Sequence, residues 1–293
     1  MVTPLSQSFI ILSYKMTSKG DGSNNGKINE VQLADSRLQY AVESWIGCKI
    51  KNEDEWCIMM CSSYIKWVGA IYDGHGGGDV SEYCQKHLLS SIIRSWEKSN
   101  KNLLSHIYTN FLDCDNNIRA DETINSNTDG STAVIAFVTE DCVIFANCGD
   151  SRGMFCVGER VIVTEDHKPN TNTERDRILR SGENLEFGCI DGSLDVSRGL
   201  GDFYYKSNSR LSATDQAVSP EPHIYTYPRS IEDEFLIIAS DGLWKNMSNE
   251  RVISLIRHEL YNQSSISDIC EKLMEHCKEL GCRDDITVII VVF

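Results

Sequence analysis

Four aspartates are candidates for chemistry because each lies within a residue or two of the end of an apolar segment. Asp73 follows "WVGAIY", Asp150 follows "CVIFANCG", Asp241 follows "EFLIIAS", and Asp284 lies just before "ITVIIVVF". A glycine adjoins the first three, and glycine lets a carboxylate and a backbone carbonyl face one point, as a hard cation requires. Turn formation explains any one of these aspartates, but all four together predict a convergent acidic cluster.

Two further acids, Glu53 and Asp54, lie beside another apolar segment and strengthen this prediction. Carboxylates packed together repel each other and take up protons unless cations compensate them. Oxygen ligands without thiolates or clustered imidazoles favour Mg²⁺ or Mn²⁺. The net charge of −15 is compatible with such a site, although on composition alone a solvated acidic surface is the better explanation. The charge argues against nucleic acid or an anionic membrane as a partner.

Short apolar segments rich in β-branched residues indicate the strands that must position these carboxylates. Seven are predicted: residues 56–61, 67–72, 131–138, 142–147, 161–164, 234–240 and 286–293. Several are continuously apolar rather than alternating, which indicates that both faces of the sheet are covered. Turn segments at 138–144 and 146–155 favour antiparallel pairing over a βαβ arrangement. A mixed α+β protein is expected.

Apolar residues at helical spacing predict four helices, at residues 80–96, 173–182, 249–260 and 266–280. Ser248 and Ser267 are the expected N-caps of the last two, and the ends of two helices are expected at Gly182 and Gly281. Sheets packed on each other and flanked by these helices would cover both faces of the strands.

Residues 1–30 are predicted to be a flexible N-terminal tail, because "MTSKGDGSNNGK" is polar and has no period. Residues 31–293 are predicted to form one domain. The twelve cysteines form no CxxC pair and several lie in apolar segments, so they are interpreted as free thiols in a reducing cytoplasmic or nuclear setting. No apolar segment has the length of a membrane span, and a monomer is the default expectation.

The chain resembles the metal-dependent Ser/Thr protein phosphatases of the 2C type, the PPM family, in eight motifs that occur in family order. They are "GCKIKNED" (47–54), "YDGHGG" (72–77), "DGSTAVIAFV" (129–138), "ANCGDSRG" (146–153), "TEDHKP" (164–169), "DGSLDVSRGLGD" (191–202), "IIASDGLWKNMS" (239–248) and "CRDDITVIIV" (282–291). The resemblance extends from about Gln39 to the end of the chain. It implies a phosphatase catalytic domain with two packed antiparallel sheets flanked by pairs of helices, a four-layer αββα β-sandwich.

The resemblance also implies a centre that holds two Mg²⁺ or Mn²⁺ ions. Asp73 would bridge the ions, the Gly74 carbonyl would bind one of them, and Asp241 and Asp284 would complete the shell of the other. Two more acids would act through metal-bound water, namely Glu53 and Asp54. Such a centre activates a bridging hydroxide for in-line attack on phosphoserine or phosphothreonine in phosphoproteins, without a phosphoenzyme.

Three further residues have roles implied by the resemblance. His75 would be the general acid that protonates the leaving alkoxide, although a structural hydrogen bond in the loop is the alternative. Asp150 would help to hold a third metal, and Arg198 would begin a flap segment that borders the cleft. For Asp150 and Arg198, anchoring of loops through salt bridges is the alternative.

Four residues depart from the family pattern. Lys49 stands where most members carry an arginine that grips the substrate phosphate, and lysine lacks the bidentate fork of arginine. A plain surface lysine is the alternative interpretation of this residue. Lys245 replaces an acid that supports the third metal, so a third ion is disfavoured. Asp195 replaces a small residue and Asp285 replaces the usual asparagine, and neither change removes a core ligand.

Two other functions remain open from the sequence alone. The substitution at Lys49 motivates a pseudophosphatase that binds phosphoproteins without turnover, whereas the intact Asp73, Asp241 and Asp284 oppose this. A two-metal phosphodiesterase acting on nucleic acid is opposed by the acidic charge and the lack of a basic stripe.

Overall fold

Two antiparallel sheets form the body of the protein in the computed structural model, which describes residues 27–32, 38–60, 64–99 and 102–293. One sheet has six strands, in the order β1 (Lys27–Gln32), β2 (Gln39–Trp45), β16 (Ile286–Val292), β15 (Asp233–Ala239), β9 (Arg152–Val157) and β10 (Arg160–Val163). The other has five, in the order β14 (His223–Pro228), β8 (Cys142–Cys148), β7 (Ala133–Thr139), β4 (Ile65–Tyr72) and β3 (Glu55–Met59).

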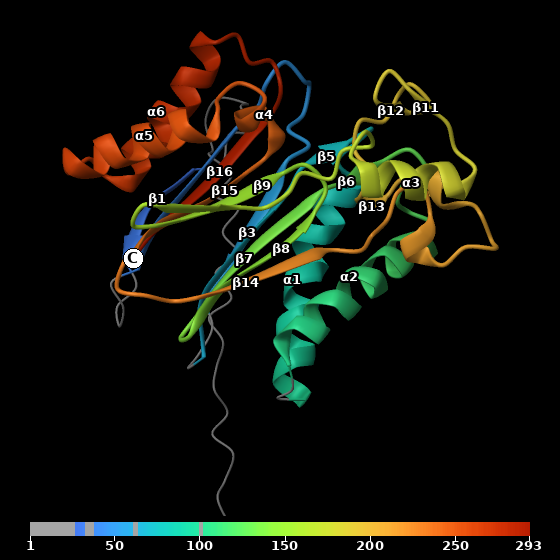
Figure 1. The fold of residues 1–293 in the computed structure, drawn as a ribbon, viewed down its shortest axis with the longest axis horizontal. Coiled ribbons are helices and arrows are strands. Elements are labelled where there is room, and N and C mark those ends of the chain that lie inside the picture. The colour runs from blue at the N-terminus through green and yellow to red at the C-terminus, as the bar shows by residue number, and fades with distance from the viewer. Residues whose placement is uncertain (1–26, 33–37, 61–63, 100–101) are drawn as a thin grey trace, which may run out of the picture.

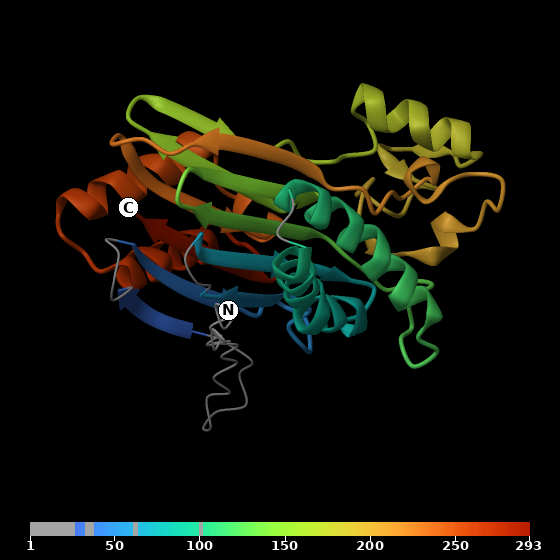
Figure 2. The same ribbon diagram turned by 90° about the horizontal axis from the view of Figure 1, so that it is seen from below.

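Pairs of helices cover the outer face of each sheet, so the body has four layers (Figures 1 and 2). The five-stranded sheet packs against α1 (Asp79–Ser99) and α2 (Leu103–Ala120). The six-stranded sheet packs against α5 (Asn249–Tyr261) and α6 (Ile266–Glu279). This is the α+β fold with an αββα arrangement that the sequence predicted.

The side chains of β7 explain why such strands are continuously apolar. Ala133, Ile135 and Phe137 belong to the core beneath α1 and α2, whereas Val134 and Val138 belong to the core between the sheets. Successive side chains of a strand point to opposite faces, so a strand between two apolar layers has no position that favours a polar residue.

The seven predicted strands correspond to β3, β4, β7, β8, β10, β15 and β16, although residue 61 lies outside the described residues. The predicted helices correspond to α1, α3 (Asn172–Ser181), α5 and α6. As predicted, Ser248 caps α5, with its side chain accepting a hydrogen bond from the Arg251 N–H. Gly182 and Gly281 follow the ends of α3 and α6 with φ of 102° and 84°, a left-handed conformation that glycine adopts without strain.

Two local predictions are wrong. The N-cap of α6 is Ser265, whose hydroxyl accepts a hydrogen bond from the Asp268 N–H, and Ser267 is already inside the helix. The segment 146–155 forms no hairpin, because β8 belongs to one sheet and β9 to the other, so the chain crosses between sheets there. In addition, β1 begins at Lys27, within the segment predicted to be a tail, and the rest of that segment lies outside the described residues.

A smaller unit, here called the flap lobe (residues 172–215), lies beside the five-stranded sheet (Figure 1). It contains α3, the hairpin of β11 (Leu185–Glu186) and β12 (Cys189–Ile190), and the 3₁₀ turns η1 (Phe203–Lys206) and η2 (Ala213–Asp215). A short sheet joins the lobe to the body, in the order β13 (Leu200–Gly201), β6 (Gly130–Ser131) and β5 (Gly74–His75).

A buried ion pair fixes the flap lobe against α2. Lys206 Nζ lies 2.7 Å from Asp115 Oδ1 and donates to the Gly199 carbonyl at 2.8 Å, and both charged side chains are almost fully buried. The substitution Lys206→Met leaves the Asp115 carboxylate without its counter-ion, so the free energy of unfolding is expected to fall by about 3–5 kcal/mol. Urea unfolding measures this loss. The double variant Lys206→Met/Asp115→Leu should recover part of it, and a double variant less stable than the single one contradicts the argument.

Candidate metal centre

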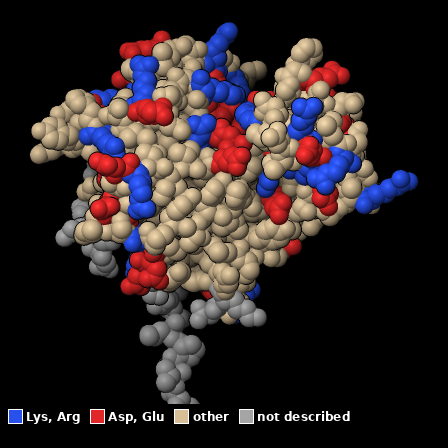
Figure 3. Space-filling model, viewed as in Figure 1, with Lys and Arg blue, Asp and Glu red and all other residues tan. Residues whose placement is uncertain are grey.

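The predicted carboxylates meet where the ends of β4, β15 and β16 border the flap lobe. A cleft of about 700 Å³ opens there. Residues of the predicted set that line it are Lys49, Glu53, Asp73, Gly74, His75, Asp150, Asp241 and Asp284. Figure 3 shows acidic side chains gathered between the positions of α4 (Asp241–Trp244) and β5.

Asp73 lies in the cleft near four other aspartates. Burial, together with the charges of Asp54, Asp241, Asp150 and Asp284, raises its pKa well above the usual range. The Asp241 N–H lies 3.4 Å from Asp73 Oδ2. Residues up to 211 positions apart in sequence (284 − 73) are thus close enough to perturb one carboxyl group, as the aspartates at strand ends predicted.

Asp54 is buried and has one unpaired oxygen. Its Oδ2 accepts hydrogen bonds of 2.8 Å from the hydroxyls of Ser240 and Thr287, whereas Oδ1 is buried without a hydrogen-bond partner among the described residues. Burial raises the pKa of Asp54 to about 6, although the Thr287 hydrogen bond opposes this. An unpaired buried carboxylate oxygen is costly, so this oxygen marks a place that suits a water or a hydrated cation.

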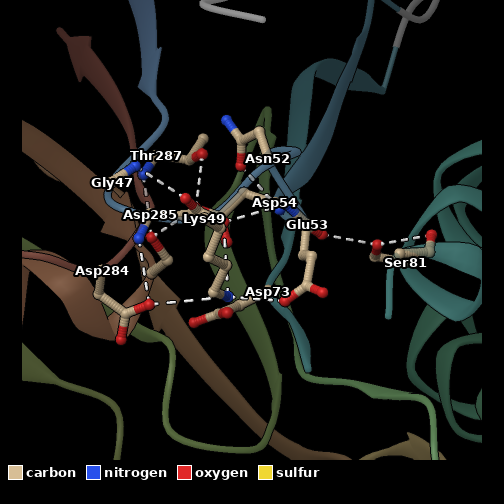
Figure 4. Close-up of polar contacts among 12 residues, drawn as sticks. Gly47, Lys49, Asn52, Glu53, Asp54, Asp73, Ser81, Asp284, Asp285 and Thr287 are labelled. Atoms are coloured by element: carbon tan, nitrogen blue, oxygen red, sulfur yellow. Dashed lines mark hydrogen bonds and ion pairs between the residues drawn. The ribbon is translucent and has the colours of Figure 1, made fainter. Parts of the chain in front are cut away.

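Lys49 lies among three carboxylates (Figure 4). Its Nζ is 2.7 Å from Glu53 Oε2, 3.4 Å from Asp285 Oδ2 and 3.7 Å from Asp284 Oδ1. Burial lowers the pKa of Lys49, but the neighbouring carboxylates raise it more, and the net shift is upward. The side chain is therefore cationic, and its ammonium is held inside the cleft.

Asp285 orders the loop that carries Lys49 and Glu53 (Figure 4). Its Oδ1 accepts a hydrogen bond from the Gly47 N–H at 2.9 Å, and its Oδ2 accepts one from the Glu53 N–H at 3.0 Å. From the sequence, Asp285 was notable only as a replacement for asparagine. The available signal was its position next to Asp284, a predicted metal ligand.

His75 pairs with Asp202, which the sequence analysis did not single out. The Nε2 atom of His75 lies 3.0 and 2.9 Å from the two carboxylate oxygens of buried Asp202. Burial lowers the pKa of His75, but the Asp202 carboxylate raises it more, so the imidazole retains its proton more readily than usual. Gly130 allows this approach, because a Cβ there would come within 2.4 Å of His75 Nε2.

Asp150 is linked to the flap lobe through Lys168. The Lys168 ammonium contacts Asp150 Oδ2 and lies 3.1 Å from Asp195 Oδ2. Burial raises the pKa of Asp150, while Lys168 opposes that shift. Lys168 thus supplies the positive charge beside Asp150, and the sequence reasoning did not identify it.

His167, buried beneath the turn before Asp150, leads to a pH prediction. Its Nδ1 accepts a hydrogen bond from the Gly149 N–H at 3.1 Å, and burial lowers its pKa from 6.5 to about 3. Between pH 6.5 and about pH 3, His167 is protonated in the unfolded chain but not in the folded protein. The free energy of unfolding is therefore expected to decrease as the pH falls through this window, by at most about 5 kcal/mol. Urea unfolding from pH 7 to pH 4 should show the difference between wild type and His167→Gln narrowing, and a constant difference contradicts the prediction.

Arg198 does not line the cleft. Its Nη2 lies 2.8 Å from Glu174 Oε1, and its Nη1 donates to the Glu221 carbonyl at 3.1 Å. The side chain therefore anchors α3 to the segment that follows the flap lobe, which is the alternative that the sequence left open.

The donor set of the cleft fits a hard divalent cation. Asp73 lies beside four other carboxylates, Asp54 presents an unpaired oxygen, and the lining offers carboxylate oxygens rather than thiolates. Within the described residues, no group of three His, Cys, Asp or Glu side chains is already arranged to hold an ion. Three lysines provide the positive charge in this arrangement, namely Lys49, Lys168 and Lys245.

The fold is shared with solved phosphatase structures. A phosphatase from a pathogenic strain of Toxoplasma gondii matches with a TM-score of 0.74 and 20% identity, covering 91% of this chain and 94% of that one. A serine-threonine phosphatase 2C from Toxoplasma gondii matches with a TM-score of 0.75 and 19% identity, covering 92% and 99%. The αββα body of this chain thus has the same fold as these two solved structures.

Sequence comparison defines the family. The model of the protein phosphatase 2C family matches residues 39–286. Protein phosphatase 1A from Homo sapiens is 36% identical over 270 residues, covering 87% of this chain and 71% of that protein. Protein phosphatase 1B from Rattus norvegicus is 34% identical over 278 residues, covering 89% and 71%. The chain therefore belongs to the protein phosphatase 2C family.

Members of this family are metal-dependent protein serine/threonine phosphatases that use Mg²⁺ or Mn²⁺ and act on phosphoproteins, and this chain is an enzyme of that class. In the part of the chain that the structure describes, no helix combines the length and apolarity needed to cross a bilayer. The cellular compartment and the monomeric state remain predictions from the sequence.

Proposed function

We propose that this chain hydrolyses phosphoserine and phosphothreonine in phosphoproteins at a centre of two divalent cations in the cleft. The observation that carries the proposal is the position of Asp73, whose carboxyl group is perturbed by four other carboxylates. Asp73, the Gly74 carbonyl, Asp241 and Asp284 would hold the ions directly. Two acids would contribute through water, namely Glu53 and Asp54. When bound, such ions lower the pKa of water and offset negative charge on phosphoryl oxygens.

In this proposal the protein's own groups position the substrate and handle the proton. His75 donates a proton to the serine or threonine alkoxide as it leaves, and Asp202 keeps the imidazole charged and oriented. The Lys49 ammonium, which lies in the cleft wall, attracts the phosphate. The ammonium groups of Lys168 and Lys245 beside Asp150 and Asp241 disfavour a third ion.

A phosphoprotein-binding module with weak or no turnover is the second candidate, because Lys49 is already engaged with Glu53 at 2.7 Å. Calorimetry with a phosphothreonine peptide and Mn²⁺, run beside a phosphate-release assay, separates the two functions. An enzyme releases phosphate on the timescale of the titration. Saturable binding with no phosphate release would overturn the proposed hydrolysis in favour of the module.

The Lys49→Arg variant tests how the phosphate is gripped. Arginine presents a planar fork that can donate to Glu53 and the phosphate together, so the KM for p-nitrophenyl phosphate is expected to fall by about threefold to tenfold. Lys51→Arg is the matched control, since Lys51 lies two residues away and its Nζ is 3.9 Å from Glu82 on α1. An unchanged KM for Lys49→Arg would show that residue 49 does not contact the phosphate.

A further inference from the structure

Lys245 lies between two of the proposed metal ligands. Its Nζ is 2.5 Å from Asp241 Oδ2 and 3.2 Å from Asp284 Oδ2, so a single ammonium bridges carboxylates that are 43 residues apart in sequence (284 − 241). A divalent ion bound by the same two oxygens would take up the space and the charge that this ammonium now occupies. The two cations would also repel each other at such separations.

The backbone fixes this arrangement. Lys245 follows α4 directly, and its N–H donates to the Asp241 carbonyl at 2.8 Å, which places the two side chains one helical turn apart. Gly242 packs tightly against the segment before β16, because a Cβ there would come within 2.1 Å of the Asp285 carbonyl oxygen. The Cys282 thiol also contacts the Gly242 carbonyl at 3.5 Å. Asp284 is therefore held within reach of Lys245.

The ammonium of Lys245 is also able to move away from the two carboxylates. Its side chain is 48% exposed, and a flexible four-carbon stem lets the ammonium rotate into solvent, where it is well hydrated. A salt bridge of this exposure contributes little net stability, so a divalent cation that binds several carboxylates can displace it.

We propose that Lys245 is an internal counter-cation that competes with the divalent ion for Asp241 and Asp284, and so sets the metal concentration at which the centre becomes loaded. The inference rests on the proposed function, because it assumes that these two aspartates are metal ligands. At low Mn²⁺ the ammonium holds the two carboxylates together, and at high Mn²⁺ it moves out to solvent.

Isothermal titration calorimetry of metal-stripped full-length protein with Mn²⁺ tests the proposal without measuring activity. Lys245→Met removes the competing charge and is expected to tighten Mn²⁺ binding by about threefold to tenfold. Lys245→Arg keeps the charge and should bind Mn²⁺ like the wild type. Lys272→Met is the matched control, because Lys272 is 45% exposed and its Nζ lies 2.5 Å from Glu259, in a pair between α5 and α6.

Thermal unfolding gives a second readout on the same variants. Without metal, Lys245→Met should melt at a lower temperature than the wild type, because two carboxylates then face each other without a cation. The rise in melting temperature on adding Mn²⁺ should be larger for Lys245→Met, since tighter binding to the folded state stabilises it more. Lys272→Met should show the same Mn²⁺-induced rise as the wild type.

The outcomes separate this inference from the proposed function. Equal Mn²⁺ affinity for the wild type and Lys245→Met would overturn the inference and leave the proposed function standing. Tighter binding by Lys245→Arg as well would also overturn it, because the charge would then be irrelevant. If neither the wild type nor Lys245→Met bound Mn²⁺ at millimolar concentrations, the proposed function itself would be wrong.

Discussion

Asp73→Asn is expected to lower Mn²⁺-dependent hydrolysis of a phosphothreonine peptide by about a thousandfold or more. The substitution keeps the size of the side chain and removes the negative charge that would lie between the two ions. Loss of that ligand is expected to weaken stabilisation of the negatively charged transition state by several kcal/mol. Initial rates of phosphate release at saturating Mn²⁺ measure the effect.

The matched control is Asp113→Asn, an exposed aspartate on α2, which should leave the rate unchanged. The metal-free Asp73→Asn protein should melt at a higher temperature than the wild type, because the amide relieves repulsion among the surrounding carboxylates. This gain shows that the variant is folded. Wild-type turnover by Asp73→Asn would rule out the proposed centre.

His75→Gln has the second largest expected effect, and its size should depend on the leaving group. Threonine alkoxide needs a proton as it leaves, so hydrolysis of a phosphothreonine peptide should slow by about 10²–10⁴-fold. p-Nitrophenolate leaves readily without a proton, so p-nitrophenyl phosphate hydrolysis should fall far less. Parallel kcat measurements with the two substrates test the role of His75 as a general acid.

A structural role for His75 gives a different result. If the imidazole only holds the loop through Asp202, the Gln variant should lose the same factor with both substrates. His87→Gln, at an exposed position of α1, serves as the control for adding glutamine in place of histidine. Equal losses for the two substrates would exclude proton donation by His75.

The layered body was predictable because the apolar pattern of each central strand indicates that both of its faces are buried. The side chains of a strand such as β7 point alternately into two apolar cores. Its continuously apolar sequence therefore indicates that an apolar layer covers each face of the sheet. The crossing between β8 and β9 was not predictable in this way. A short turn looks the same whether the next strand pairs with the last one or joins the opposite sheet.

Helix α2 could have been predicted from the sequence but was not. Its buried residues recur at helical spacing along one face, namely Leu103, Ile107, Phe111, Cys114 and Ile118. The opposite face is rich in asparagine, aspartate, serine and threonine, which have low helix propensity and obscure the pattern. Packing of the apolar face against α1 and the sheet overrides that propensity.

The acids of the candidate site could be predicted from the sequence, but the residues with which they form ion pairs and hydrogen bonds could not. Acid positions at strand ends identified Asp73, Asp241 and Asp284 without any partner being known. The ion pair between Lys245 and Asp284 and the contact between His75 and Asp202 depend on tertiary packing over 39 and 127 residues. No local sequence pattern identifies partners that are so far apart in the chain.

Metal-dependent hydrolysis is tested by measuring phosphate release from a phosphothreonine peptide as Mn²⁺ is returned to metal-stripped wild-type protein. We expect no release in EDTA, a saturable increase as Mn²⁺ is added, and loss of activity when EDTA is restored. Undiminished release in EDTA, or none at any Mn²⁺ concentration from folded protein, would contradict this expectation.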